Sequence, residues 1–217
     1  MRLGTTRIII LVLSVLALIM TTGCSTAYYS AMEKLGKEKR HLLKDNVEDV
    51  QDSQTKAQEE FKDALTRIKE ITNFQGGDLE AFYDRLKSSY EDCESRAAQI
   101  EKRIASVETV ASDLFSEWET EIKQINDTKL KSSSKASLAE AKSKYQKLSS
   151  AMNQSTKGMY PVLAKLNDYV LYLKHNLNAR AVGALGGEVV SIEKEVTDLI
   201  SDMNRSISEA DNFIKTF

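Results

Sequence analysis

The chain has 217 residues, with 30 Lys and Arg against 32 Asp and Glu, nine glycines and one proline. Because acids and bases are interspersed, no basic face is expected, and this argues against nucleic-acid binding. Glycine and proline are common in turns, and an all-β fold needs many turns. Their low number therefore argues against an all-β fold and favours a few long helices.

The N-terminus has the three parts of a secretory signal. Two arginines and no acid precede the apolar run Ile8–Met20, and small residues lead from there to Cys24. The run is shorter than the roughly 20 apolar residues that a membrane-spanning helix needs. We therefore predict that residues 1–23 form a cleaved signal peptide.

The end of this signal resembles the lipobox of bacterial lipoproteins, in which a small residue precedes a cysteine that receives lipid. Gly23 and Cys24 match that pattern, whereas Thr21 stands where leucine is usual. The resemblance implies a lipid on Cys24 that holds the chain to the membrane. Ser25, in place of an aspartate, favours the periplasmic face of the outer membrane. The alternative is cleavage after Ala27, which would release a soluble product.

Cleavage before Cys24 leaves 28 basic residues, since Arg2 and Arg7 are lost, against 32 acids, for a net charge of −4. Cys93 is then the only cysteine besides the anchor, so no internal disulfide can form. Either Cys93 is a redox or cross-linking thiol, or it is a small buried apolar group. Its place in an apolar seam favours burial.

Four apolar seams with a spacing of three and four residues predict four long helices, over about 31–72, 79–126, 132–175 and 179–216. The first two seams are Val47, Val50, Gln54, Ala57, Phe61, Ala64, Ile68, Ile71 and Tyr83, Leu86, Tyr90, Cys93, Ala97, Ile100, Ile104, Val107, Ala111, Leu114, Trp118. The other two are Leu138, Ala141, Tyr145, Leu148, Met152, Ser155, Met159, Val162, Leu166, Tyr169, Leu173 and Val182, Leu185, Val189, Ile192, Val196, Leu199, Met203, Ser206, Ala210. We predict an all-α domain over 24–217, a four-helix bundle with coiled-coil-like packing. The alternative is two extended hairpins that pair only in a dimer.

Three interruptions separate the seams. The segment Asn73–Asp78 supplies two glycines to stop a helix and an aspartate to cap the next. Asn126-Asp127 and the serines at 132–134 mark the second turn. A slip in seam phase places the third at 175–178, with Asn178 as the cap, and so puts Gly183, Gly186 and Gly187 inside the fourth helix.

Pro161 lies within the third seam, whose phase continues across it, so it predicts a kink rather than a helix end. A hinge and a static kink that fits the bundle both remain open. The charge balance just after the anchor, Glu33–Lys44, is basic, with five Lys or Arg against two acids. These residues could touch anionic headgroups or form an ordinary solvated helix flank.

Catalytic or metal-binding patterns are scarce. Glu38 and His41 have the Glu-x-x-His spacing of di-iron bundles, but the only other histidine, His175, has no glutamate at the matching offset. No nucleophile–base pair, phosphate-binding loop or metal-spaced cysteine cluster is present. The seam aromatics Tyr83, Tyr90, Tyr145 and Trp118 could stack on a ligand or simply fill the core. We predict that the protein is not an enzyme and holds no cofactor or metal.

Three segments carry a resemblance to a known family: AYYSAMEKLGKEKR after the anchor, NFQGGDLE at the first turn and PVLAKLNDYVLYLKHNLNARA around the third. They resemble a group of bacterial lipoproteins that is catalogued only as a domain of unknown function. The resemblance implies an envelope-located helical protein and assigns no functional residues.

The expected function is that of a non-enzymatic, lipid-anchored envelope protein. It would act through helix–helix interactions with an envelope protein partner or with itself. The alternative is a ligand- or lipid-sensing periplasmic helical bundle. An internal apolar pocket lined by seam aromatics would favour that alternative.

Overall fold

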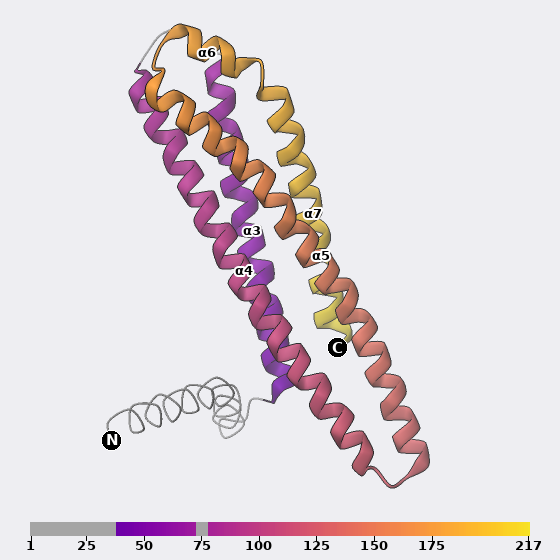
Figure 1. Ribbon diagram of the computed structural model, residues 1–217. Coiled ribbons are helices and arrows are strands. Elements are labelled where there is room, and N and C mark those ends of the chain that lie inside the picture. The colour runs from indigo at the N-terminus through magenta and orange to yellow at the C-terminus, as the bar shows by residue number, and fades with distance from the viewer. Residues whose placement is uncertain (1–37, 73–77) are drawn as a thin grey trace, which may run out of the picture. The chain divides into compact units, whose positions relative to one another are not determined.

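The structure, a computed structural model, describes residues 38–72 and 78–217, and every regular element in these ranges is an α-helix (Figure 1). The helices are α3 (Lys39–Thr72), α4 (Leu79–Gln124), α5 (Thr128–His175), α6 (Ala179–Gly186) and α7 (Val189–Thr216). The predicted all-α class is therefore confirmed. The predicted signal peptide, Cys24 and residues 31–37 of the first predicted helix lie outside the described residues.

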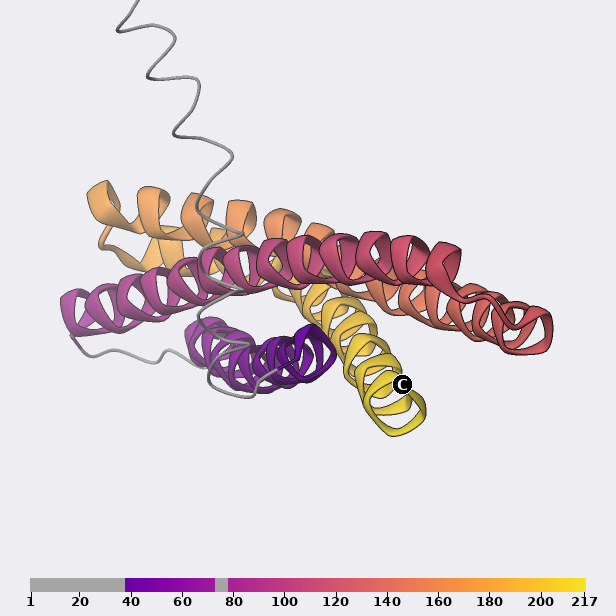
Figure 2. The ribbon, with the colours of Figure 1, turned by 90° about the horizontal axis from the view of Figure 1, so that it is seen from below.

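Residues 44–217 pack as one unit, in which successive long helices run in opposite directions (Figure 1). Helices α4 and α5 form a hairpin, and α7 packs back along α5. Helix α3 contacts both α4 and α7, and Figure 2 shows α3 and α7 on the same side of the α4–α5 hairpin. Ion pairs join α3 to these neighbours, at Asp49–Arg103 (2.8 Å), Glu60–Arg96 (3.5 Å) and Lys69–Glu193 (2.5 Å).

Burial confirms the seam phase along all four long predicted helices. Every member of the first seam is at most 1% exposed, and the third and fourth seams are buried apart from Tyr145 and Val182. At three positions, the residue predicted to be buried is the sequence neighbour of the residue that is buried in the structure. Phe82, Phe115 and Ala181 are the buried residues where the pattern chose Tyr83, Leu114 and Val182.

A layer of polar side chains crosses the middle of this apolar core. Gln54, Ser155 and Ser206 are completely buried, and the Gln54 amide donates to Ser155 Oγ at 2.7 Å. Gln54 Oε1 and Ser206 Oγ make no hydrogen bond to a protein group. Buried polar atoms without partners destabilise a fold, so this layer lowers the stability of the core. The same polar atoms favour the helix register in which Gln54 meets Ser155.

The turn between α4 and α5 is shorter than predicted. It occupies only Ile125–Asp127, and the Asp127 carboxylate caps α5 by accepting from the Leu130 amide at 2.9 Å. The serines at 132–134 lie inside α5, so the expectation that they mark the turn was wrong. The aspartate cap satisfies the first turn of α5, and the three serines that follow do not break the helix.

The turn after α5 is where seam phase placed it. Helix α5 ends at His175, and the Asn178 side chain accepts from the amides of Arg180 and Ala181 at 3.1 Å each. The fourth predicted helix is not continuous, however, because it is divided into α6 and α7. Gly187 and Glu188 lie at the break, where the Glu188 amide bonds to Leu185 O in a tighter turn (3.0 Å). Two successive glycines lower the helix propensity there, and the side chain of Glu188 makes no cap.

Two further expectations concern single residues. The carboxylate of Asp78 caps α4 by accepting from the amides of Glu80 and Ala81, as predicted, while the rest of that turn lies outside the described residues. Pro161 lies inside α5, which continues through it. The proline is exposed, so its ring meets the solvent rather than the core.

Candidate interaction surface

Large exposed apolar side chains gather in one short stretch of the sequence, between the end of α5 and the start of α7. Leu171 and Tyr172 of α5 are 52% and 38% exposed, Leu177 of the connecting loop is 40% exposed, and Val190 of α7 is 76% exposed. Exposed apolar side chains that cluster around one structural feature are typical of interaction sites. We refer to these four residues as the α6-end surface.

The backbone around α6 fixes the position of these side chains. Asn176 ends α5 by bonding through its side chain to Tyr172 O at 2.9 Å. The Asn178 cap then starts α6, whose buried face is formed by Ala181 and Leu185. Both capping residues therefore hold the chain in a fixed path between Tyr172 and α7.

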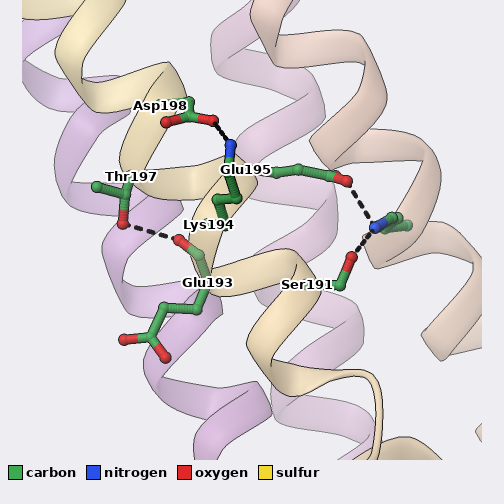
Figure 3. A network of polar contacts seen from close by, with 7 residues as sticks. Ser191, Glu193, Lys194, Glu195, Thr197 and Asp198 are labelled. Atoms are coloured by element: carbon green, nitrogen blue, oxygen red, sulfur yellow. Dashed lines mark hydrogen bonds and ion pairs between the residues drawn. The ribbon is translucent and has the colours of Figure 1, made fainter.

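Polar contacts fasten α7 to α5 directly beyond the α6–α7 break (Figure 3). The Lys165 ammonium donates to Ser191 Oγ and pairs with Glu195 Oε1, both at 2.6 Å. On the outer side of α7, Lys194 pairs with Asp198 at 2.6 Å. These groups are partly exposed, so they position the start of α7 more than they stabilise it.

Tyr169 lies near this network and is 7% exposed. Its hydroxyl and Glu195 Oε2 each make no hydrogen bond to a protein group. Burial, followed by the negative charges of Glu188 and Glu195, raises the pKa of Tyr169 to about 12. The hydroxyl is therefore a neutral hydrogen-bond donor at physiological pH.

The seam aromatics are dispersed rather than gathered around one cavity. Trp118 donates to Ser134 Oγ at 2.9 Å, and the Tyr90 hydroxyl donates to Glu94 at 2.7 Å. Tyr145 packs edge-on against Phe115 and Phe213. A groove of about 490 Å³ between α5 and α7 contains no aromatic side chain, and its lining consists of Ser143, Gln146, Lys147, Ser150, Ala151, Gln154, Arg205 and Glu209.

Cys93 is fully buried on its seam, as its apolar interpretation predicted. Burial, followed by the nearby carboxylates of Glu60 and Asp92, raises the pKa of its thiol to about 12. The thiolate that redox or metal chemistry requires is therefore suppressed. Among the described residues, no group of three or more His, Cys, Asp or Glu is arranged to hold a metal ion.

The α6-end surface was not singled out from the sequence, although a signal for it exists. Residues 169–173, Tyr-Val-Leu-Tyr-Leu, are apolar at five successive positions, so they surround the whole helix rather than one face. The seam accounts for Tyr169 and Leu173 only. Of the residues between them, Val170 is also buried, whereas Leu171 and Tyr172 are in excess of what the core needs, and such an excess predicts exposed apolar surface.

Within residues 38–72 and 78–217, no helix combines the length and apolar content that crossing a bilayer requires. No curated protein and no solved structure matches the chain. A family profile, by contrast, matches residues 28–217, which is most of the sequence and includes all five described helices. The chain therefore belongs to the family described as "Protein of unknown function (DUF2959)".

Proposed function

We propose that this protein is a non-enzymatic lipoprotein, held on the periplasmic face of the outer membrane by lipid on Cys24, that binds a partner through helix–helix contacts. The partner is an envelope protein or a second copy of the chain. The observation that carries the proposal is the α6-end surface, where Leu171, Tyr172 and Val190 expose apolar area on two long helices.

Two properties make this surface suitable for binding another helix. Leu171 and Tyr172 project from the last turns of α5, which Asn176 caps, and the Lys165 contacts hold the start of α7, so little ordering is needed on binding. An amphipathic partner helix could cover the exposed leucine, tyrosine and valine side chains in the way that helices fill apolar grooves. The surface also lies at the end of the bundle opposite the α4–α5 turn. Asp127, in that turn, precedes the start of α5, whereas Lys165 and the surface residues of α5 lie toward the other end of this helix.

In-cell photo-cross-linking tests the proposal. A photoreactive amino acid is placed singly at Leu171, Tyr172 or Val190 of the full chain, and adducts are identified by mass spectrometry. We expect one discrete protein adduct, shared by the three positions. Ser201 is the matched control, because it is also exposed on α7 but lies outside the surface. Equal adducts at Ser201, or none at the three test positions, would contradict the proposal.

A charged double variant separates loss of binding from loss of folding. Leu171→Lys with Val190→Lys alters only exposed side chains, so helical circular dichroism should stay unchanged while the adduct at Tyr172 disappears. An adduct with the mass of two chains would identify self-association. A different mass would identify an envelope protein.

The anchor is tested separately. Labelled fatty acid should enter the wild-type protein but not Cys24→Ser, which should accumulate as an unprocessed precursor or as a soluble product cleaved after Ala27. Absence of label from the wild type would contradict the lipoprotein part of the proposal and leave the interaction part standing.

A further inference from the structure

The α4–α5 hairpin is longer than the helices that pack beside it. Near the C-terminus of α7, Tyr145 contacts Phe115 and Phe213, and Phe213 stacks on Phe217. The last polar contact between α5 and α7 is from Lys144 to Thr216 O at 3.3 Å. Residues 116–143 continue past this level as a two-helix arm, and Figure 1 shows the arm extending beyond the C-terminus.

The arm is held together by contacts between its own two helices. Ile122, Leu138 and Ala141 are buried in it, and Trp118 donates to Ser134 across it. Its core is therefore complete without α3 or α7. The tip of the arm is correspondingly available for contacts outside the bundle.

The tip has an unusual composition for this chain. Residues 123–135 contain four lysines (Lys123, Lys129, Lys131 and Lys135) and a single acid, Asp127, which is engaged as the cap of α5. None of the ion pairs among the described residues includes any of these lysines. Leu130 stands between Lys129 and Lys131 in the sequence and is 64% exposed, and the Lys131 ammonium donates to Lys123 O at 3.2 Å.

We propose that this tip docks on the anionic surface of the membrane to which the chain is anchored. Lysines attract negatively charged headgroups, and their long side chains can extend to the phosphates while Leu130 enters the interface. Of the acids of α4, Glu117 and Glu119 lie farther from the turn than Lys123, and Glu119 is bonded to Lys142, while Glu121 comes two residues before Lys123. The tip therefore presents its positive charge and its apolar side chain together.

The chain geometry allows anchor and tip to meet one membrane. Asp49 of α3 lies beside Arg103 of α4, and from Arg103 to Gln124 the arm rises about 32 Å at 1.5 Å per residue. The 25 residues from Cys24 to Asp49 reach roughly 38 Å even if fully helical, and farther if extended. A weak contact at the tip is sufficient, because a tether gives it a high effective concentration at the surface.

This inference rests on the proposed lipid anchor, so the experiment uses the full lipidated chain reconstituted into vesicles. An environment-sensitive fluorophore is attached at Leu130→Cys in a Cys93→Ala background, and quenchers are placed on the lipids. In vesicles of phosphatidylethanolamine and phosphatidylglycerol, we expect quenching at position 130 several-fold above that of a matched label at Val190→Cys. High salt should reduce it, since surface charges are screened.

Charge-reversal variants test the chemistry of the contact. Lys129→Glu with Lys131→Glu should lower the quenching at position 130 to the level at 190, whereas Lys174→Glu, at the other end of α5, should leave it unchanged. Equal quenching in vesicles of phosphatidylcholine alone would overturn the role of anionic headgroups. Quenching no stronger at 130 than at 190, while the protein still floats with the vesicles, would overturn the tip contact. A chain that does not float at all would overturn the anchor instead.

Discussion

The two described reversals of the chain are built differently. Between α4 and α5 the chain turns in three residues, with one aspartate cap and a polar, lysine-rich surface. Between α5 and α7 it uses a capped loop, the eight-residue helix α6 and a second break at Gly187-Glu188. The simple turn ends an arm with its own small core, whereas the elaborate one displays four exposed apolar side chains. The comparison shows that the two ends of the bundle expose different side chains, mainly lysines at one and apolar groups at the other.

The largest expected difference between the ends is in core mutants. Leu173 is 0% exposed and Ile122 is 4% exposed, so truncation to Ala removes similar buried area from each. Leu173→Ala should lower the global free energy of unfolding by about 2–5 kcal/mol. Ile122→Ala should act mainly on the arm, because only two helices form the core there.

Hydrogen exchange and urea unfolding distinguish these outcomes. In Ile122→Ala, amide exchange should accelerate within 116–143 while the global midpoint moves little. A global loss as large as that of Leu173→Ala, without faster exchange in the arm, would show that the arm and the bundle unfold as one unit.

Helix caps should give the next largest effect. Asn178→Ala and Asp127→Ala should each lower stability by about 1 kcal/mol. The loss at Asn178 should be the greater, since its side chain accepts from two amides and that of Asp127 from one. Asn178→Asp retains the acceptor and serves as the control. If thermal unfolding is lowered equally by Asn178→Asp and Asn178→Ala, capping is not the reason for the loss.

Glycine substitutions should give a smaller and opposite effect at the α6 end. A Cβ added to Gly183 would meet no atom within 4 Å, so Gly183→Ala should raise stability by about 0.4–1 kcal/mol. At Gly158 the added Cβ would lie 3.3 Å from Leu199 Cδ1, which must shift to make room. Gly158→Ala should therefore stabilise less than Gly183→Ala. The reverse order of melting temperatures would indicate that α6 needs its glycine for another reason.

In neutral buffers the least effect is expected from two phenols, that of the partly buried Tyr145 and that of the buried Tyr169. Burial is the main cause that raises the pKa of both Tyr145 and Tyr169 to about 12. A raised pKa favours the neutral form in the folded state, so this contribution to stability is complete below pH 10 and is lost between about pH 10 and 12. Ultraviolet titration should show both phenols ionising later than free tyrosine. Ionisation of either one at pH 10, before unfolding, would contradict the burial assigned to it.

Heptad phase predicted most of the fold, because helices of this length bury one narrow face. It located Cys93 and Gln54 in the core. It also placed the third turn at Asn178, although glycines later in the sequence suggested a turn there instead. It failed where neighbouring apolar residues compete for one core position, as Phe115 does with Leu114. It also missed the division at Gly187, since both parts of the fourth helix keep the same phase.

The candidate surfaces were harder to predict than the core. Seam periodicity says which side of a helix faces inward, and Tyr172, Leu177 and Val190 lie on no seam. Whether an off-seam apolar residue is covered also depends on where neighbouring helices end, as at Leu130, because α7 ends before the arm does. Caps and turns set the length of each helix separately. The apolar pattern of one helix therefore does not show how far that helix extends beyond its neighbours.

The polar contacts of α3 have a consequence for the order in which the protein can assemble. Gln51, Gln54 and Gln58 bond to Asp211, Ser155 and Asn204, partners that follow 160, 101 and 146 residues later in the chain. The α4–α5 hairpin, by contrast, needs only contacts between neighbours in sequence and can close early. During synthesis, the apolar face of α3 therefore emerges before those of the other described helices and waits for partners that come later in the chain. Until the final residues of α7 arrive, this face stays exposed, and transiently exposed apolar surface is prone to aggregation.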